Sequence, residues 1–133
     1  MKTTAIIEIG KDSTYDIYTN DNGLGFMILG QGKTIEEAKS DFLKNRDELV
    51  ELYERNGESF DFAHLEFEFK YDTKSFLRYS PFTLTWLSSA TGINKKQLSH
   101  YSTGVRNPSK ATMEKIRAAI ENFVKDYRQV IFD

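Results

Sequence analysis

The chain has 133 residues, 39% of them hydrophobic and 29% charged, which is typical of one folded domain or two small ones and not of a disordered segment. It contains no cysteine and two histidines, so disulfides and thiolate-bound zinc or iron–sulfur centres are excluded. No apolar run approaches the roughly 20 residues of a membrane span, and residues 1–10 lack the long apolar region of a signal peptide. We therefore expect a cytoplasmic protein with no membrane partner.

The two halves of the chain carry opposite charge. Residues 1–69 hold 7 lysines and arginines against 15 aspartates and glutamates, a net charge of −8, whereas residues 70–133 hold 11 against 5, a net charge of +6. A basic segment has the sign that nucleic-acid phosphates attract, and an acidic segment suits a basic protein. Taken alone, the charges fit two differing solvated surfaces equally well.

Alternating hydrophobicity predicts three strands in the N-terminal part. The apolar residues Ala5, Ile7 and Ile9 alternate along the first strand, and residues 15–19 (YDIYT) alternate again after a short polar turn, which indicates a hairpin. Residues 20–23 (NDNG) predict the next turn. The apolar residues 26–29 predict a third strand, which the segment GQG ends.

One helix and a fourth strand follow. Thr34 can cap the helix with Glu37 completing a capping box, and residues 56–57 (NG) can end it. The helix carries one apolar stripe, formed by Ile35, Ala38, Phe42, Leu49, Leu52 and Tyr53. Residues 65–71 (LEFEFKY) place large apolar residues on one face and charges on the other, as a strand does. This order predicts a small sheet with one helix packed on a face.

The C-terminal part is predicted to be helical. Residues 72–79 indicate a short helix, and residues 80–81 (SP) an N-cap followed by proline at the first position of the next helix. Gly92 ends that helix, Asn94 begins another, and Gly104 ends it. The joint between the two parts is expected near residue 72.

A long final helix is predicted after residues 107–109 (NPS), which form a turn and a cap. Its apolar face consists of Met113, Ile116, Ile120, Phe123 and Tyr127. With residues 130–132 (VIF) this is more apolar surface than a small helical core needs. It predicts a homodimer formed through the C-terminal part, with simple core packing as the rival interpretation.

Residues 83–104 have the pattern of a helix-turn-helix. This motif needs a small residue where the second helix crosses the first, and Ser88 is small. It needs a glycine of positive φ at the turn, which Gly92 provides, and apolar residues after the turn and within the second helix, which Ile93 and Leu98 provide. An ordinary helical hairpin is the rival interpretation, and the joint fit of these positions favours DNA binding.

The second helix of the motif would project its first turns into the major groove. These turns carry Lys95, Lys96, Ser99 and His100, side chains that can hydrogen-bond to base edges or phosphates. The motif and the turn after it resemble the lambda-repressor-type (XRE-like) helix-turn-helix family. The resemblance places base-reading positions at Lys95, Lys96 and His100. The residues expected to bind DNA are Asn94, Lys95, Lys96, Gln97, Ser99, His100 and Arg106.

The resemblance to a second family spans nearly the whole chain. Residues 70–133 are similar to the C-terminal part of HicB-type antitoxins, and residues 30–38 (GQGKTIEEA) resemble the "G-x-T-x-E-E-A" segment that begins the single N-terminal helix of that family. The resemblance implies an α+β fold in which residues 1–71 form a β-β-β-α-β partial RNase H-like domain. Residues 72–133 would form an all-α helix-turn-helix domain.

HicB-type proteins bind a small basic RNA-cleaving toxin with the N-terminal domain, and dimerise and bind their own operator with the C-terminal domain. The resemblance therefore implies a toxin-binding autorepressor that uses no cofactor, no metal and no catalytic residue. The −8 and +6 charges of the two parts agree with that division.

Two other function classes remain open. The first is a stand-alone repressor whose N-terminal domain senses a small molecule. The second is a nuclease or nucleotide-dependent enzyme that would depend on Glu8, Asp16 or Lys33. Residues 30–34 (GQGKT) resemble part of a phosphate-binding loop, but Met27 stands where the first glycine of that motif belongs.

Overall fold

The computed structural model describes residues 1–20 and 23–133. The turn predicted at residues 20–23 includes residues 21 and 22 and so lies outside the described residues. The strands are β1 (Lys2–Ile9), β2 (Tyr15–Thr19), β3 (Leu29–Gly32) and β4 (Glu66–Tyr71). The helices are α1 (Ile35–Arg55), the 3-10 turn η1 (Phe62–His64), α2 (Thr73–Tyr79), α3 (Leu84–Thr91), α4 (Lys95–Thr103) and α5 (Lys110–Tyr127).

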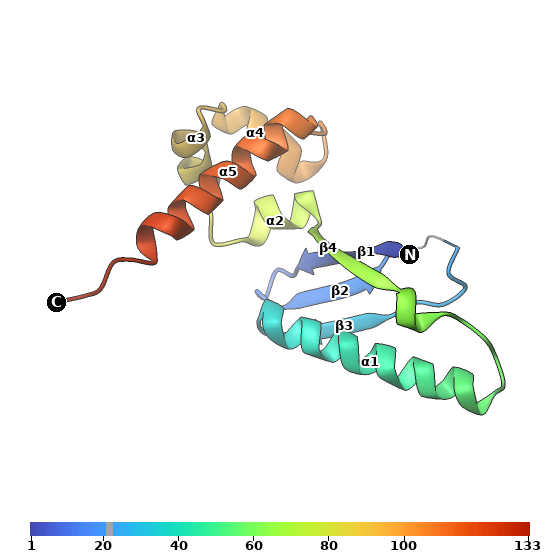
Figure 1. Ribbon diagram of the computed structural model, residues 1–133. Helices are drawn as coiled ribbons and strands as arrows, with labels where there is room; N and C mark the ends of the chain where they lie inside the picture. Colours follow the sequence, from blue (N-terminus) through green and yellow to red (C-terminus); the bar gives the residue numbers. More distant parts are fainter. Residues whose placement is uncertain (21–22) are drawn as a thin grey trace.

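The strands form one mixed sheet in the order β3-β2-β1-β4 (Figure 1). The β1–β2 and β2–β3 pairs are antiparallel, and β1 and β4 are parallel. The parallel pair needs a crossover, and α1 supplies it by lying between β3 and β4 in the sequence. The even-numbered residues of β1 lie on the face opposite to Ala5, Ile7 and Ile9, so the sheet has one buried and one open face.

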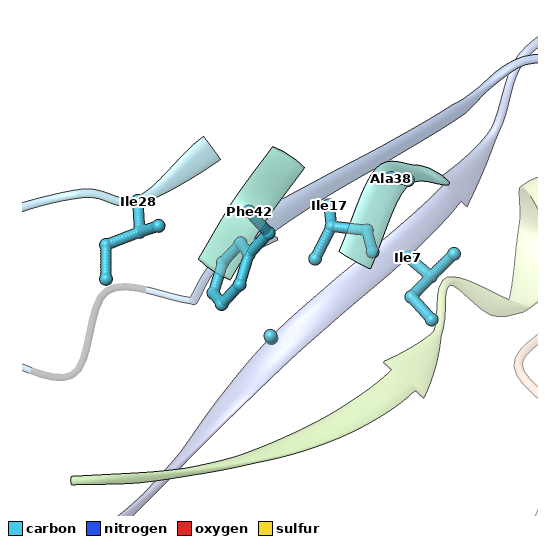
Figure 2. Close-up of a cluster of buried hydrophobic side chains, with 6 residues drawn as sticks. Ile7, Ile17, Ile28, Ala38 and Phe42 are labelled. Carbon is cyan, nitrogen blue, oxygen red and sulfur yellow. The ribbon is translucent and has the colours of Figure 1, made fainter. Parts of the chain in front are cut away.

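Helix α1 covers the buried face of the sheet. Phe42 is fully buried there, with its ring edge-on to Phe67 and Phe69 of β4. Figure 2 shows Phe42 and Ala38 of α1 beside Ile7 of β1, Ile17 of β2 and Ile28, the residue before β3. Fully burying one such large side chain stabilises the fold by about 1.5–3 kcal/mol. Leu52 belongs to the same apolar stripe of α1 in the sequence, yet its side chain is 43% exposed, because α1 extends beyond the sheet.

The third strand differs from the prediction. The sequence predicts this strand at residues 26–29 and a turn at residues 30–32, whereas β3 spans Leu29–Gly32. A Cβ on Gly30 would lie 2.5 Å from the Ala38 carbonyl oxygen, and one on Gly32 would lie 2.6 Å from the Ala38 nitrogen. The two glycines therefore do not end the strand. They let β3 lie directly against the backbone of α1.

The predicted caps of α1 are confirmed, with one change of partner. Thr34 accepts a hydrogen bond from the Glu37 N–H at 3.0 Å, as an N-cap does. The Glu37 carboxylate reaches back to the N–H of Lys33, at 2.8 Å, one residue before the cap. Asn56 ends the helix and Gly57 follows with a φ of 68°.

The helices after β4 pack around a second hydrophobic cluster. Its buried members are Leu77, Leu87, Leu98, Tyr101 and Ile116. The predicted helix at residues 72–79 is confirmed, with Asp72 as its N-cap. The predicted start of the next helix at residues 80–81 is wrong: α3 begins at Leu84, because Thr83 is the residue that caps it. Ser80 instead ends α2 and accepts the N–H of Phe82.

The predicted fold class, in which an α+β chain has its helices gathered in a separate C-terminal all-α domain, is wrong in that separation. The described part of the chain is α+β, with a four-stranded mixed sheet and five α-helices, and these helices are not all gathered in a C-terminal all-α domain. Helix α1 packs on the sheet, and α2 is joined to it. The Ile9 N–H donates to Ser75 Oγ at 3.0 Å, and the Asp72 N–H donates to the Ile7 carbonyl at 2.8 Å. These bonds continue the β1–β4 ladder to the start of α2.

The end of α5 carries exposed apolar side chains. Tyr127 stacks on Phe123 yet is 65% exposed, and Ile131 and Phe132 are almost fully exposed. Figure 1 shows the C-terminal end of α5 and the residues after it extending away from the rest of the molecule. Among the described residues, no helix is long and apolar enough to cross a membrane.

Candidate nucleic-acid interface

Helices α3 and α4 form the two helices of the predicted motif. Gly92 caps α3 with a φ of 77°, a left-handed conformation that glycine adopts without strain, as the sequence predicts. The Ser88 hydroxyl donates to the Ile93 carbonyl at 2.6 Å, which ties the first helix to the turn. Thr91 accepts the Ile93 N–H at 3.2 Å. The angle between the two helices is thus held by specific bonds as well as by packing.

One face of α4 is buried and the other is exposed. Leu98 is fully buried, and Tyr101 and Ser102 are nearly so. The buried side packs against α2 and α3. Because α4 is anchored along this whole side, its outer side chains are presented on a rigid support.

The start of α4 is exposed and basic. The Asn94 side chain accepts the Lys96 N–H at 2.8 Å and so caps the helix. Lys95 and Lys96 are both exposed, and in the described residues neither side chain forms an ion pair or a hydrogen bond. Two lysines and the positive end of a helix dipole together make an anion-attracting surface.

The other predicted DNA-binding residues differ in how far their side chains are exposed. Ser99 and His100 lie half-buried one turn further along α4, and Arg106 is exposed after the helix. The Arg106 N–H donates to the His100 carbonyl at 3.2 Å, which holds the loop close to the end of α4. Gln97 donates to the Tyr101 hydroxyl at 2.8 Å, so its amide serves the helix itself and is the predicted residue least available to a ligand.

Lys74 adds a positive charge that the sequence does not predict at this place. A Cβ on Gly104 would lie 2.7 Å from the Lys74 Nζ, so this ammonium sits at the C-terminal end of α4, where helix carbonyls attract it. Lys74 is exposed and belongs to α2, and only tertiary packing brings it here. No local pattern in the sequence could reveal this neighbour.

Comparison of the chain with protein-family models, with curated proteins and with solved structures gives no match.

The open face of the sheet carries acidic groups. Glu8 of β1 and Asp16 of β2 are direct cross-strand neighbours. The Tyr18 hydroxyl donates to Glu8 at 2.7 Å, and Gln31 donates to Asp16 at 2.9 Å. Partial burial and the hydrogen bond to the Glu8 carboxylate raise the pKa of Tyr18 above its ordinary value. These residues border a hollow of about 450 Å³, which also reaches Asp41 of α1.

The glycine segment before α1 does not have the features of a phosphate site. The Gln31 N–H donates to the Asp41 carboxylate at 2.9 Å, and the Lys33 N–H donates to the Glu37 carboxylate at 2.8 Å. A phosphate would have to displace two carboxylates that occupy the donors it needs. Among the described residues, no three acidic or histidine side chains lie close enough to hold a metal ion.

Proposed function

We propose that this chain is an antitoxin of the HicB type, which binds operator DNA through α4 and neutralises a small basic RNA-cleaving toxin through its acidic sheet. The observation that carries the proposal is the exposed, unpaired Lys95 and Lys96 at the capped start of a rigidly anchored second helix. The protein acts in the cytoplasm by binding and occlusion, without catalysis.

In DNA binding the predicted residues of α4 have different roles. Lys95, Lys96 and His100 enter the major groove and contact base edges or phosphates, and Ser99 lies beside them. Arg106 contacts a phosphate from the loop after the helix. Phosphate contacts supply much of the affinity and set the register, whereas base contacts supply the sequence preference.

A two-fold operator is read by two copies of the motif. The exposed apolar residues at the end of α5 support a dimer contact there, since burying them against a second copy removes apolar surface from water. They are Val124, Tyr127, Val130, Ile131 and Phe132.

Toxin binding is supported by the charge of the sheet part. Residues 1–69 carry a net charge of −8, and Glu8 and Asp16 lie on the sheet face opposite the one that α1 covers. A toxin that cleaves RNA must present a basic surface to its substrate, and the acidic face competes for that surface.

Selection from a random pool of duplex DNA tests the DNA-binding part. The chain should enrich a single two-fold sequence, and Lys95→Ala with Lys96→Ala should abolish the enrichment. The matched control, Lys33→Ala with Lys44→Ala, removes the same charge from exposed positions on the sheet part and should enrich the wild-type sequence. Failure of the wild type to enrich any sequence would contradict the proposal.

Expression of a tagged chain in its native host tests the toxin-binding part. A small, basic, stoichiometric partner that stops growth when expressed alone is expected, and Glu8→Gln with Asp16→Asn should release it at lower salt. A clean homodimer without a partner would contradict the antitoxin proposal. It would favour a stand-alone repressor, whose acidic face would then be screened for a small-molecule ligand.

A further inference from the structure

The two outer edges of the sheet are treated differently by the fold. Two outward backbone groups of β3 bond to α1: the Gln31 N–H donates to Asp41 at 2.9 Å, and the Asn45 side chain donates to the Leu29 carbonyl at 2.6 Å. Such capping hinders another strand from adding to an edge. The edge formed by β3 is therefore partly blocked by α1.

The edge formed by β4 has no such cap. The N–H groups of Glu66 and Asp72 donate to the carbonyls of Met1 and Ile7, both at 2.8 Å, so the even-numbered residues of β4 point their backbone groups toward β1. The odd-numbered residues, namely Phe67, Phe69 and Tyr71, consequently point theirs outward. No hydrogen bond joins these outward groups to any other part of the chain that the structure describes.

The side chains along this edge are also incompletely covered. Helix α1 packs chiefly over β3 and β2, the two strands farthest from the β4 edge. The side chains of Phe67 and Phe69 are only half-buried, and Tyr71 is 45% exposed. The Lys39 ammonium lies 4.8 Å from the centre of the Phe69 ring. A strand added here would satisfy six backbone groups and cover three aromatic rings.

We propose that the open edge of β4 pairs with the same edge of a second copy of the chain, antiparallel and centred on Phe69. In this register Glu68 lies opposite Lys70 of the second copy, and Lys70 opposite its Glu68. Phe69 meets its own copy, and Phe67 meets Tyr71 of the second copy on the face that carries α1. The strand is thus complementary to itself in both charge and shape.

The neighbouring symmetric register is less favourable. Centring the pair on Glu68 places two Glu68 carboxylates directly opposite each other, and like charges in that position repel. The paired sheets would share one two-fold axis and form a continuous eight-stranded sheet, with both copies of α1 on the same side. This contact is separate from the proposed contact at the end of α5 and does not depend on DNA or toxin binding.

Cysteine crosslinking tests the pairing and its register, because the chain contains no cysteine of its own. Directly opposite residues have Cβ atoms about 5 Å apart, whereas diagonal ones are about 7 Å apart. A mixture of Glu68→Cys and Lys70→Cys chains should therefore form several-fold more disulfide-linked dimer under mild oxidation than either variant alone. Lys11→Cys, at an exposed turn, mixed with Glu68→Cys gives the collision background.

Each outcome decides the inference. Preferential linkage of the mixture supports it. Preferential linkage of Glu68→Cys with itself would overturn the register, and linkage no greater than the Lys11→Cys background would overturn the pairing. Both positions are exposed, so the variants should fold, and circular dichroism checks this.

Charge exchange provides an independent measurement. Glu68→Lys alone opposes lysines across the pair and should weaken the β4 contact on the order of tenfold, and Lys70→Glu should do the same. Mixing these two variants, or combining both changes in one chain, restores opposite charges and should restore the association measured by sedimentation. A Glu68→Lys, Lys70→Glu chain that stays as weak as the single variants would overturn the pairing.

Discussion

Gly30→Ala should destabilise the sheet part severely. The added Cβ would lie 2.5 Å from both the Ala38 carbonyl oxygen and the Phe42 nitrogen, and 2.6 Å from the Phe42 Cβ. None of these atoms can rotate away, because all belong to the backbone of α1 or are fixed directly to it. Overpacking a core generally costs about 1–3 kcal/mol, and backbone obstruction puts this substitution at the upper end, about 3 kcal/mol. That is a large share of the roughly 5–15 kcal/mol of a small domain.

Gly57→Ala is the matched control. Gly57 has a φ of 68°, but a Cβ there meets nothing within 4 Å, so the expected loss is only the strain of a left-handed alanine, about 1 kcal/mol. Urea unfolding followed by far-ultraviolet circular dichroism measures both variants. Equal losses for the two variants would refute the assignment of Gly30 to a strand pressed against α1.

The same experiment shows whether the two hydrophobic clusters unfold together. The single tryptophan, Trp86, packs against Phe82 and Phe123 in the helical cluster, so its fluorescence reports on that cluster alone. Because Ser75 and Asp72 hydrogen-bond to β1, Gly30→Ala should lower the midpoint seen by fluorescence as well as by circular dichroism.

Three further predictions follow from single contacts. Ser88→Ala removes the hydrogen bond to the Ile93 carbonyl and should lower the free energy of unfolding by about 1 kcal/mol in urea, together with DNA affinity. Ser109→Ala removes the N-cap of α5 and should likewise lower stability by about 1 kcal/mol, with DNA affinity largely retained. The raised pKa of Tyr18 means that its contribution to stability is complete below the ordinary tyrosine pKa of 10.0 and is lost as the pH rises through the folded-state pKa. Tyr18→Phe, which cannot ionise beside Glu8, should therefore lose less stability than wild type in alkaline thermal unfolding, and an unchanged alkaline profile would contradict this.

Local signals in the sequence predicted the ends of elements well. Thr34, Asn94 and Ser109 all cap helices in the structure, and Gly92 and Gly104 both adopt a positive φ at helix ends. Each of these roles is decided by a residue and its neighbours within one turn, so a short stretch of sequence is sufficient to reveal it.

Roles that depend on distant parts of the chain were not predictable in the same way. A glycine can end a strand or admit a close neighbour, and only the position of α1 shows that Gly30 does the second. Ser80 and Thr83 both carry a hydroxyl that can cap a helix, and in the structure Thr83 is the residue that caps α3. Lys74 reaches Gly104, and α2 is bonded to β1, only because the chain folds back on itself.

The candidate interface also contains a local contact that the sequence did not reveal. Lys95, Lys96 and Arg106 are exposed as their polarity suggests, whereas Gln97 is held by Tyr101 one turn away. The polarity of Gln97 suggests a side-chain amide that is free to bind a ligand. In the structure the Tyr101 hydroxyl on the same helix accepts its hydrogen bond.

Binding of the selected DNA sequence as a function of salt concentration tests the central claim most directly. For wild type, the logarithm of the affinity should fall linearly with the logarithm of the salt concentration. For Lys95→Ala with Lys96→Ala, affinity should fall sharply and the slope should become shallower by about 1.8 if both lysines contact phosphate, and by less if one reads a base. The Lys33→Ala with Lys44→Ala control should leave both quantities unchanged. Unchanged affinity and slope in the Lys95, Lys96 variant would contradict the assignment of α4 as the DNA-binding helix.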